Sequence, residues 1–554
     1  MDYKSSLAQL ISTAGVEKEE IEGIITKTLE LGNGDYTMPC FKLSKKLRKA
    51  PAMIAEDIKK CISAQLPSWI EKVEAVNGYL NFFLNRNEYV ERVITSPMPT
   101  HNSNGKNICI DYSSVNIAKP FHIGHLLTTV IGGSLYRIFG YLGYNVVGIN
   151  HLGDYGTQFG KLITAYLKWG NGEEQTMDSL LKLYVKFHDE AEKDESLNDE
   201  ARKWFKKIED EDETALSIFN TFKETTLREV DKVYKRLDIT FDSYNGESFY
   251  NDKMDEIVDI LKSKNLLVES EGAYVVEMGD DIPPCLILKS DGASLYATRD
   301  LAAALYRKRT YDFDKNLYVV AYQQNLHFKQ VFKVLELMGY DWNKDCVHVP
   351  FGMVSLENST LSTRHGKVVF LRDVLDTAVK KTLDIIETKN PNLDKKDEVA
   401  EQVGVGAVIF MALSTGRIKD MVFSYDKALN FDGETGPYLQ YTHARCCSLL
   451  EKGNFDSSIK VDSSLLTSDI CYSIIKHIEA FDDTVADAAD KYEPSIISRY
   501  LIDLAQMFNK FYFDCRIITD DVAMTNARLK ITAMVKEVLK KGMELILLKA
   551  PEKM

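Results

Sequence analysis

A strand-like segment that runs through a tight turn into a long apolar helix constrains the fold of this chain most. Residues 107–114 alternate in polarity and are β-prone, and residues 116–120 form a turn. The sequence His-Ile-Gly-His at 122–125 then opens an apolar-periodic stretch that predicts a helix. A helix N-terminus after a strand and a loop offers backbone N–H groups and a positive dipole end, which suit phosphate. The two histidines add donors for the same anion.

Strand and helix signals keep alternating beyond this point. Residues 145–150 and 317–322 predict strands, and residues 325–338 predict a helix. Such alternation is typical of an α/β protein with a doubly wound parallel sheet, a Rossmann-like fold. Residues of about 170–240 are helical in pattern and heavily charged, which indicates an insertion into that fold.

Two loop-like stretches divide the chain into three parts. The turn formers at 95–105 separate an α+β N-terminal domain, residues 1–95, from a central domain at residues 106–388. A second polar loop at 389–397 precedes an all-α C-terminal domain, residues 396–554. Three domains are consistent with a length of 554 residues, because single cores stop growing near ~250–300 residues.

Composition excludes some classes of protein. No run of 18 apolar residues occurs, and the N-terminus lacks the pattern of a secretory signal, so neither a membrane nor export is expected. The nine cysteines contain no Cys-x-x-Cys, which favours reduced thiols in a cytoplasm and no metal site. The net charge of −14 argues against DNA or indiscriminate nucleic-acid binding. It leaves open the binding of one folded RNA through local basic patches.

Four further motifs accompany the histidine sequence. They are NHLGDYGTQFG at 150–160, SDGASLYATRD at 290–300, AYQQNLH at 321–327 and LSTRHGK at 361–367. Together they resemble the class I aminoacyl-tRNA synthetases, and specifically the arginyl-tRNA synthetase family, over nearly the whole chain. The segments FDGETGPYLQY at 431–441 and KAPEKM at 549–554 are similar to that family's anticodon-binding domain.

The resemblance implies a two-step reaction that uses ATP and Mg²⁺. An amino acid carboxylate attacks the α-phosphate of ATP, pyrophosphate leaves, and the terminal ribose of tRNA then takes the aminoacyl group. No enzyme nucleophile is needed, so the protein positions the reactants and neutralises charge. His122 and His125 would donate to the nucleotide, and Gly124 would let adenine approach the backbone. The family further implies that arginine activation requires bound tRNA.

The basic loop departs from the common class I pattern. Thr363 stands where most of these enzymes carry the second lysine of Lys-Met-Ser-Lys-Ser. Arginyl enzymes commonly lack that lysine, and Lys119 is the suspected replacement. Lys119 and Arg364 are therefore expected at the triphosphate, with Ser362 beside ATP. The alternative for Lys119 is a solvated surface cation.

Arginine is the expected substrate on chemical grounds as well. A guanidinium is planar, carries five donors and is always charged, so its pocket must offer carboxylates and other acceptors. A lysine substrate would not require a pocket with two carboxylates, so the presence of both Asp300 and Glu247 favours arginine over lysine. The alternative for Asp300 is a structural role, as the partner of Arg299 or as a helix-terminal charge. The residues expected to bind arginine, partly by resemblance, are Asn116, His122, Glu247, Tyr296, Asp300 and Gln324.

Aromatic residues of the C-terminal domain are candidates for stacking on tRNA bases. The resemblance implies that Tyr441, Tyr512 and the final Met554 meet the anticodon loop, with Tyr438 a further candidate. Because aromatics at helical spacing are more often core, we expect Phe508, Phe511 and Phe513 to lie inside. The N-terminal domain is expected to contact the tRNA corner.

The sequence thus predicts an arginine–tRNA ligase whose partners are tRNA(Arg), L-arginine and ATP, acting in the cytoplasm as a monomer. One alternative is a synthetase-like RNA-binding or regulatory protein that has lost catalysis. Degraded histidines or missing pocket acids would signal that loss, and all are intact. Another is a small nucleotidylyltransferase, but such enzymes lack a helical domain after the basic loop.

Overall fold

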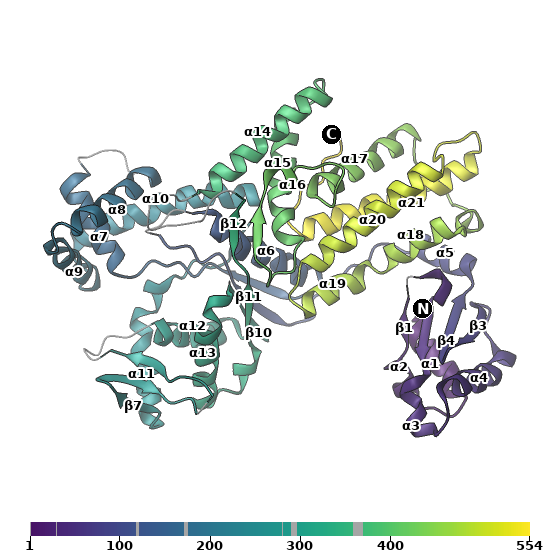
Figure 1. Cartoon of the computed structure of the whole chain (residues 1–554), viewed down its shortest axis with the longest axis horizontal. Helices are drawn as coiled ribbons and strands as arrows, with labels where there is room; N and C mark the ends of the chain where they lie inside the picture. Colours follow the sequence, from purple (N-terminus) through teal and green to yellow (C-terminus); the bar gives the residue numbers. More distant parts are fainter. Residues whose placement is uncertain are drawn as a thin grey trace.

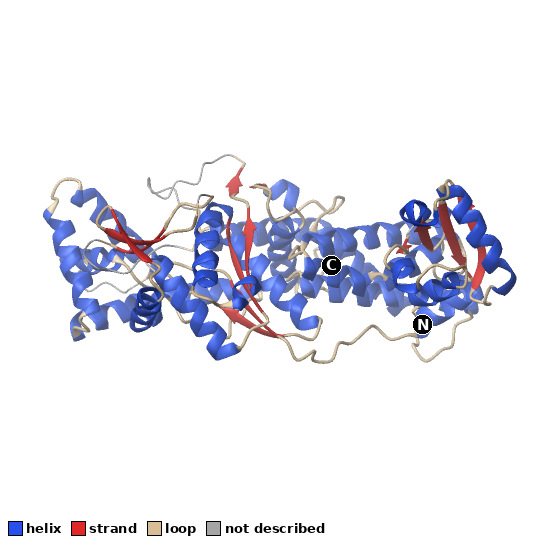
Figure 2. Cartoon of the chain, turned by 90° about the horizontal axis from the view of Figure 1, so that it is seen from below, coloured by secondary structure: helices blue, strands red, loops and turns tan. Residues whose placement is uncertain are grey.

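The computed structural model of the chain describes residues 2–28, 30–117, 121–170, 176–279, 281–289, 296–357 and 369–554. The molecule is elongated, with the N-terminal domain at one end and the helices α7–α9 at the other (Figures 1 and 2). A parallel sheet and a bundle of long helices lie between them. No helix of the described residues combines the length and the apolar character needed to cross a membrane.

The N-terminal domain is a four-stranded antiparallel sheet in the order β1–β2–β4–β3, with helices beside it. Its strands are β1 (Thr26–Lys27), β2 (Tyr36–Pro39), β3 (Ile70–Val76) and β4 (Tyr79–Leu84). Its helices are α1 (Tyr3–Ser12), α2 (Lys18–Glu22), α3 (Ser44–Leu47), α4 (Pro51–Ile62) and α5 (Arg86–Thr95). Helix α4 begins at Pro51, whose fixed φ suits a first helical position, and its buried face carries Ile54, Ile58 and Ile62.

The central domain is built on a four-stranded parallel sheet in the order β11–β10–β5–β6. Its strands are β5 (Asn107–Asp111), β6 (Asn145–Ile149), β10 (Lys315–Ala321) and β11 (Cys346–Phe351). The helices that connect or cover them include α6 (Leu126–Tyr141), α11 (Met254–Ser263), α12 (Tyr296–Tyr311) and α13 (Asn325–Leu337). The predicted doubly wound parallel sheet is confirmed.

Helix α6 lies very close to the sheet, because it carries glycine where another residue would need space. A Cβ at Gly132 would lie 2.2 Å from the Cβ of Tyr112, which follows β5. Every described residue from Leu126 to Leu135 on this helix is buried. The close packing fixes the helix N-terminus, and with it the histidine motif, relative to the end of β5.

Two further units extend the central domain. The predicted helical insertion consists of the helices α7 (Thr157–Trp169), α8 (Met177–Ala191), α9 (Ser196–Glu209) and α10 (Glu213–Leu237). A three-stranded antiparallel sheet contains β7 (Leu267–Ser270), β8 (Ala273–Val276) and β9 (Cys285–Leu288). This second sheet leads into α12, which carries the predicted pocket residues Tyr296 and Asp300.

The C-terminal part is helical except for one short strand. Its long helices are α14 (Leu371–Lys389), α15 (Lys396–Leu413), α17 (Gly436–Lys452), α18 (Asp469–Glu479), α19 (Phe481–Asp490), α20 (Ser495–Asp514) and α21 (Val522–Leu545). A short helix, α16 (Tyr425–Ala428), follows the strand β13 (Met421–Phe423). This strand pairs in parallel with β12 (Val354–Leu356), so the helical part is joined to the central domain by a ladder.

A group of buried charges fixes the N-terminal domain to helix α18. Glu479 accepts hydrogen bonds from Lys27 Nζ at 2.7 Å and from Tyr89 and Arg92. A second carboxylate, Asp35, pairs with Lys476 Nζ at 2.7 Å in the same interface. We call the residues Lys27, Asp35, Tyr89, Arg92, Lys476 and Glu479 the docking cluster.

Candidate active site

The loops that follow β5, β6 and β10 meet at one edge of the parallel sheet, where ligands of open α/β sheets bind. Asn116 after β5 forms an isolated bridge with Gly153 after β6, and the N–H of Gly153 donates to the Val115 carbonyl at 2.9 Å. Glu247 joins this edge because its N–H donates to the carbonyl of Leu152 at 2.8 Å. The structure thus brings two predicted arginine-binding residues, Asn116 and Glu247, to the same pair of loops.

The histidine motif forms a short 3₁₀ turn, Ile123–His125, that leads directly into α6. The N–H of Gly124 donates to His122 Nδ1 at 3.0 Å, and the N–H of His122 donates to His125 Nδ1 at 3.2 Å. Because Nδ1 accepts in each ring, Nε2 is the nitrogen left to donate to a ligand. The centroids of the two rings lie 4.1 Å apart.

Gly124 is needed here for a reason that the sequence did not reveal. A Cβ at this position would lie 2.6 Å from Cε1 of His122. The glycine therefore gives space to the imidazole of the motif itself. Its predicted role beside adenine remains a prediction.

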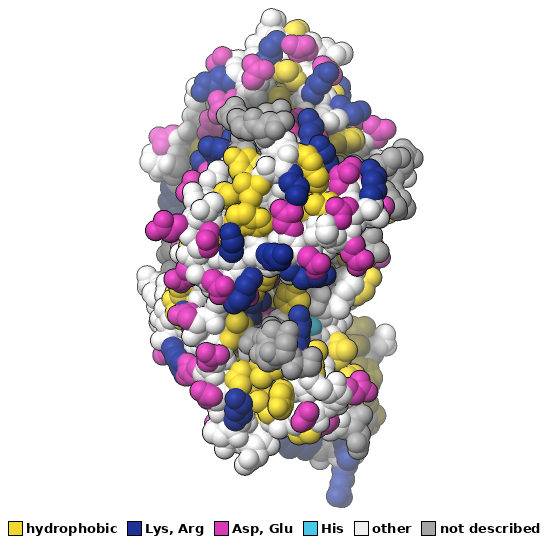
Figure 3. Space-filling model, turned by 90° about the vertical axis from the view of Figure 1, so that its left-hand side faces the viewer, with side chains coloured by type: hydrophobic (Ala, Val, Ile, Leu, Met, Phe, Trp, Pro, Cys, Tyr) yellow, Lys and Arg dark blue, Asp and Glu magenta, His cyan; other side chains and the backbone are white. Residues whose placement is uncertain are grey.

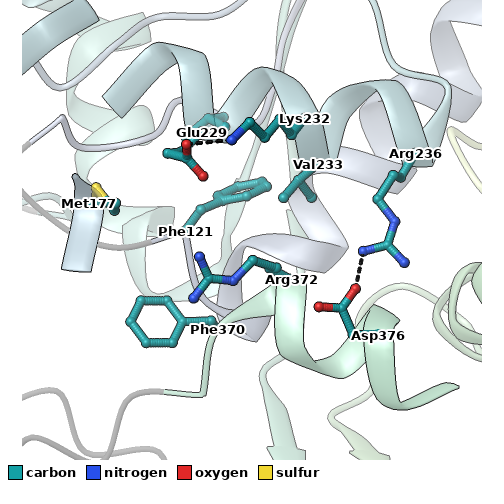
Figure 4. A pocket seen from close by; sticks show the side chains of 10 residues that line it. Phe121, Met177, Glu229, Lys232, Val233, Arg236, Phe370, Arg372 and Asp376 are labelled. Atoms are coloured by element: carbon teal, nitrogen blue, oxygen red, sulfur yellow. Dashed lines mark hydrogen bonds and ion pairs between the residues drawn. The ribbon is translucent and has the colours of Figure 1, made fainter. Parts of the chain in front are cut away.

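The segment that follows the basic loop holds the histidine motif in place. The N–H of Ile123 donates to the Val369 carbonyl, and the N–H of Leu371 donates to the Phe121 carbonyl, both at 3.0 Å. Behind this pairing lies a largely apolar pocket of about 260 Å³ between α10 and the start of α14 (Figure 4). Phe121 and Phe370 line it, and Arg372 lies over the Phe370 ring. The histidine motif and the chain after the basic loop thus form one connected unit.

Three of the predicted ATP-site residues cannot be placed. Lys119, Ser362 and Arg364 lie outside the described residues. The described residues that flank these gaps, Ile117, Phe121 and Val369, lie beside the histidine motif. Their roles stay predictions.

Asp300 lies on α12 and forms an ion pair with a histidine of the neighbouring helix. Nε2–H of His327, on the first turn of α13, donates to Asp300 Oδ2 at 2.6 Å. The side chains of Asp300 and His327 are 25% and 24% exposed, so the pair is only partly accessible to solvent. The sequence alternative, a pairing of Asp300 with Arg299, does not occur, since Arg299 lies beside Glu247 instead, at 3.6 Å.

Glu247 is an acid whose charge is poorly compensated. Burial and the negative charges of Asp300 and Asp154 raise its pKa to about 7, although Arg299 acts in the opposite direction. The Arg299 guanidinium is itself shared, because it lies over the Tyr155 ring at 4.4 Å. A cationic ligand between Glu247 and Asp300 would offset the charge of both.

A second layer of charge lies beneath these acids. Arg307 is 1% exposed and donates to Asp111 Oδ2 at 2.7 Å, at the end of β5. His151, which follows β6, has a lowered pKa because it is buried, and its Nδ1 has no partner among the described residues. Burial alone would raise the pKa of Asp300, but the hydrogen bond from His327 and the charge of that ring, with smaller contributions from His151 and Arg307, outweigh burial and lower this pKa. Asp300 is therefore ionised at neutral pH.

Tyr296 and Gln324 lie at the mouth of this region. Tyr296 is the first residue of α12 and is 68% exposed, and Gln324 ends the exposed turn after β10. Tyr296 and Asp300 occupy the same helix four residues apart, as expected. Their contacts with a substrate are untested.

Sequence reasoning missed several side chains of this region, namely His151, Arg299, Arg307 and His327. Three of them, His151, Arg299 and His327, stand inside quoted motifs, so their position in those motifs was the available signal. Arg307 carries no local signal, because its partner Asp111 is 196 residues away along the chain.

In the helical part, Tyr441 and Tyr512 are both half-exposed and flank one arginine. The guanidinium of Arg445 lies 4.8 Å from the first ring and 4.9 Å from the second. Met554 packs against the apolar cluster of α14 and α15, and its carbonyl accepts from Asn390. Phe508 and Phe511 are buried as expected. The prediction for Phe513 was wrong: it is 89% exposed, because it lies near the end of α20 and faces away from the bundle.

The surface shows no uniform charge on the face at the insertion end. Lys and Arg side chains gather in a band across its middle, with Asp and Glu side chains around the band (Figure 3). This pattern is consistent with the overall charge of −14 and with local, rather than general, attraction for an anion.

Comparison with known families accounts for the whole arrangement. The model described as "tRNA synthetases class I (R), catalytic domain" matches residues 91–425. The DALR anticodon binding domain matches residues 439–554, and the arginyl tRNA synthetase N terminal domain matches residues 1–84. The parallel sheet, the histidine motif and these matches define a class I aminoacyl-tRNA synthetase.

Whole-chain relatives narrow the class to a family. The chain is 51% identical to an arginine–tRNA ligase of Alkaliphilus metalliredigens and 50% identical to one of Clostridioides difficile, with complete coverage of both chains in each case. The chain belongs to the arginyl-tRNA synthetase family.

Solved structures show the same fold. The arginyl-tRNA synthetase of Thermus thermophilus has a TM-score of 0.84 at 24% identity, with 99% of each chain covered. That of Plasmodium falciparum has a TM-score of 0.83 at 26% identity, covering 100% of this chain and 99% of the other.

Proposed function

We propose that this protein is an arginine–tRNA ligase. It activates L-arginine with ATP, releases pyrophosphate and transfers arginine to the terminal ribose of tRNA(Arg). The observation that carries the proposal is the pair of acids, Glu247 and Asp300, at the sheet edge that also holds the histidine motif, in a chain of this family. The planar guanidinium of arginine has five N–H donors in a fork, so it can donate hydrogen bonds to two carboxylates at once.

In the first step the histidine pair acts on the nucleotide. The Nε2–H donors of His122 and His125 stabilise negative charge that builds on the α-phosphate as the arginine carboxylate attacks, and the N-terminus of α6 adds to that field. Lys119, Ser362 and Arg364 are proposed to hold the triphosphate. Asn116, Tyr296 and Gln324 complete the arginine site by resemblance to the family.

ATP enters as its magnesium complex. Within the ranges that the structure covers, no three His, Cys, Asp or Glu side chains come together to hold a metal ion. Mg²⁺ bound mainly by phosphate oxygens and water suits such a site. The ion thus belongs to the substrate, and the residues of this chain orient the phosphates.

For tRNA, we propose that Tyr441 and Tyr512 stack on bases of the anticodon loop and that Met554 lies beside them. Their support is the exposure of both rings around Arg445, together with the anticodon-binding match at residues 439–554. Each stacked base contributes about 1–3 kcal/mol. The N-terminal domain is proposed to contact the tRNA corner.

We further propose that the protein is a monomer. We also propose that it works in the cytoplasm and does not bind DNA. Nine free cysteines, six of them buried, are typical of a reducing compartment. Size-exclusion chromatography with light scattering tests the monomer.

The proposed activity is tested by pyrophosphate exchange with each of the twenty amino acids, with and without tRNA(Arg). We expect exchange with arginine alone, and only when tRNA is present. Exchange with another amino acid would contradict the specificity. A complete absence of exchange would favour the inactive RNA-binding alternative, which nothing in the site supports.

A further inference from the structure

A histidine already forms a hydrogen bond with the carboxylate that is proposed to bind the substrate guanidinium. His327 holds Asp300 Oδ2 at 2.6 Å, across the contact between α12 and α13. Phe328, the next residue, is buried and stacks on His348 of β11, which fixes the first turn of α13. On α12, the hydroxyl of Thr298 donates to the Ile287 carbonyl of β9 at 2.6 Å. Because both helix starts are anchored, the fold sets the distance between the two side chains.

The described residues provide one hydrogen bond to Asp300, and it comes from His327. A carboxylate can accept on both oxygens, so Oδ1 is the oxygen that suits a substrate donor. The neutral histidine donates one N–H and leaves the negative charge intact. The protonated histidine cancels that charge, as a guanidinium would.

We infer that His327 is a positioning residue for arginine: its neutral ring orients Asp300 toward the guanidinium, and its protonated ring competes with that guanidinium. This inference rests on the proposed function, because it takes Asp300 as a guanidinium contact. It adds a residue and a proton linkage to that site.

The surroundings of the pair decide the sign of the linkage. Burial lowers the pKa of His327, but the bond to Asp300 and its charge outweigh burial, so the pKa is raised above 6.5. The other charged or titratable groups that act on one or both members of the pair come from several elements. They are His151, Glu247, Cys285, Arg307, Tyr318 and His348. A bound guanidinium adds positive charge beside His327 and favours its neutral form.

At a pH below the raised pKa of His327, arginine binding should therefore release a proton from the His327 ring. The KM for arginine should rise toward acid. Glu247 contributes in the same direction, since it becomes neutral below about pH 7 and then no longer attracts a guanidinium. With both groups titrating, log KM should change by about two per pH unit on the acid side.

The test compares His327→Gln, His327→Ala and wild type in tRNA arginylation between pH 6 and 8.5. Glutamine keeps an N–H for Asp300 but does not titrate, so we expect near-native KM at pH 8.5 and a slope of about one, from Glu247 alone. Alanine removes the donor and should raise KM about tenfold to a hundredfold with kcat little changed. The matched control is His101→Gln, which alters a second histidine–aspartate pair outside the site, His101 Nε2 to Asp482 Oδ1 at 2.7 Å, and should leave the wild-type slope unchanged.

Three outcomes would overturn the inference. They are a His327→Gln slope equal to wild type, a near-native KM in His327→Ala, or a loss of kcat without a change in KM. Failure of the proposed function is distinguishable, because wild type would then not arginylate tRNA at any pH. If His327→Ala does not fold, the slope of His327→Gln still decides.

Discussion

Two partly buried glutamates of this chain have pKa values shifted in opposite directions. Glu479, in the docking cluster, has its pKa lowered from 4.5 to about 2, because Lys27, Arg92 and Tyr89 outweigh the effect of burial. Glu247, at the sheet edge, has its pKa raised to about 7, because burial and neighbouring acids outweigh Arg299. Their side chains are similarly exposed, 21% and 20%, so burial alone does not separate them.

The difference lies in how fully the chain satisfies each carboxylate. Glu479 accepts three hydrogen bonds from its own protein, one of them at 2.7 Å from Lys27, and has little capacity left. Glu247 has one cation at 3.6 Å, and that cation is shared with Tyr155. A saturated acid stabilises a fold, whereas an acid left short of positive charge is prepared for a cationic ligand.

The largest effect should come from the histidine pair, which serves the nucleotide and not the acids. We expect His125→Ala to lower kcat about 100- to 1000-fold, because one preorganised donor at a charged centre is worth about 3–4 kcal/mol. The arginine KM should change little. Steady-state arginylation measures both constants, and a loss of arginine affinity at native kcat would remove His125 from the nucleotide site.

The next effect concerns Asp300. Replacing it with alanine should raise the arginine KM about a hundredfold, since an unpaired buried guanidinium costs about 3 kcal/mol. Loss of the pair with His327 should also lower stability, because the pKa of Asp300 is lowered in the folded protein. The comparison variant is Asp35→Ala in the docking cluster, for which we expect lower stability with a native KM. A native KM in Asp300→Ala would exclude it from the pocket.

Glu479→Gln should destabilise the junction between the N-terminal domain and α18 by about 3 kcal/mol at pH 7, the value of a shift of this size. Since the folded pKa is depressed, this contribution is present above pH 4.5 and is lost as the pH falls toward 2. Thermal unfolding between pH 7 and 3 measures it. The control is the exposed Glu88→Gln of α5, and equal melting temperatures of the two variants would contradict the comparison.

Glu247→Gln should have the opposite sign and a similar size. Because the folded pKa is raised, the stabilisation from the neutral form is complete below pH 4.5 and is lost as the pH rises through about 7. Glutamine preserves the neutral form, so at pH 8 the ligand-free protein should gain about 3 kcal/mol while arginine binds more weakly. Destabilisation at pH 8 in this variant would show that Glu247 is structural.

Local patterns in the sequence predicted much of this architecture. The strand-like run at 317–322 is β10, and the periodic stretch after it is α13, because both depend on neighbours in the chain. The pairing of β12 with β13 joins segments 67 residues apart, and no local pattern contains that distance. Phe513 was misjudged for a related reason: helical spacing gives a face, but only the packed bundle decides which face is covered.

The sequence predicted several residues of the site but not the ion pairs that these residues form. The histidine motif, Glu247 and Asp300 could be named from motifs in the sequence. The partner of Asp300 could not be named, because His327 lies on a neighbouring helix. The sequence also does not show whether Arg299 pairs with Glu247 or with Asp300. These choices depend on distances of a few ångströms between elements, which spacing along a chain does not encode.

The most direct test of charge recognition by Glu247 and Asp300 is competition between arginine and citrulline, its neutral urea isostere, in arginylation at pH 8. Both share the same shape and differ in charge. We expect citrulline at a hundredfold excess to inhibit wild type little, since charge compensation of about 3 kcal/mol is missing. Inhibition by citrulline at concentrations equal to the arginine KM would contradict the account.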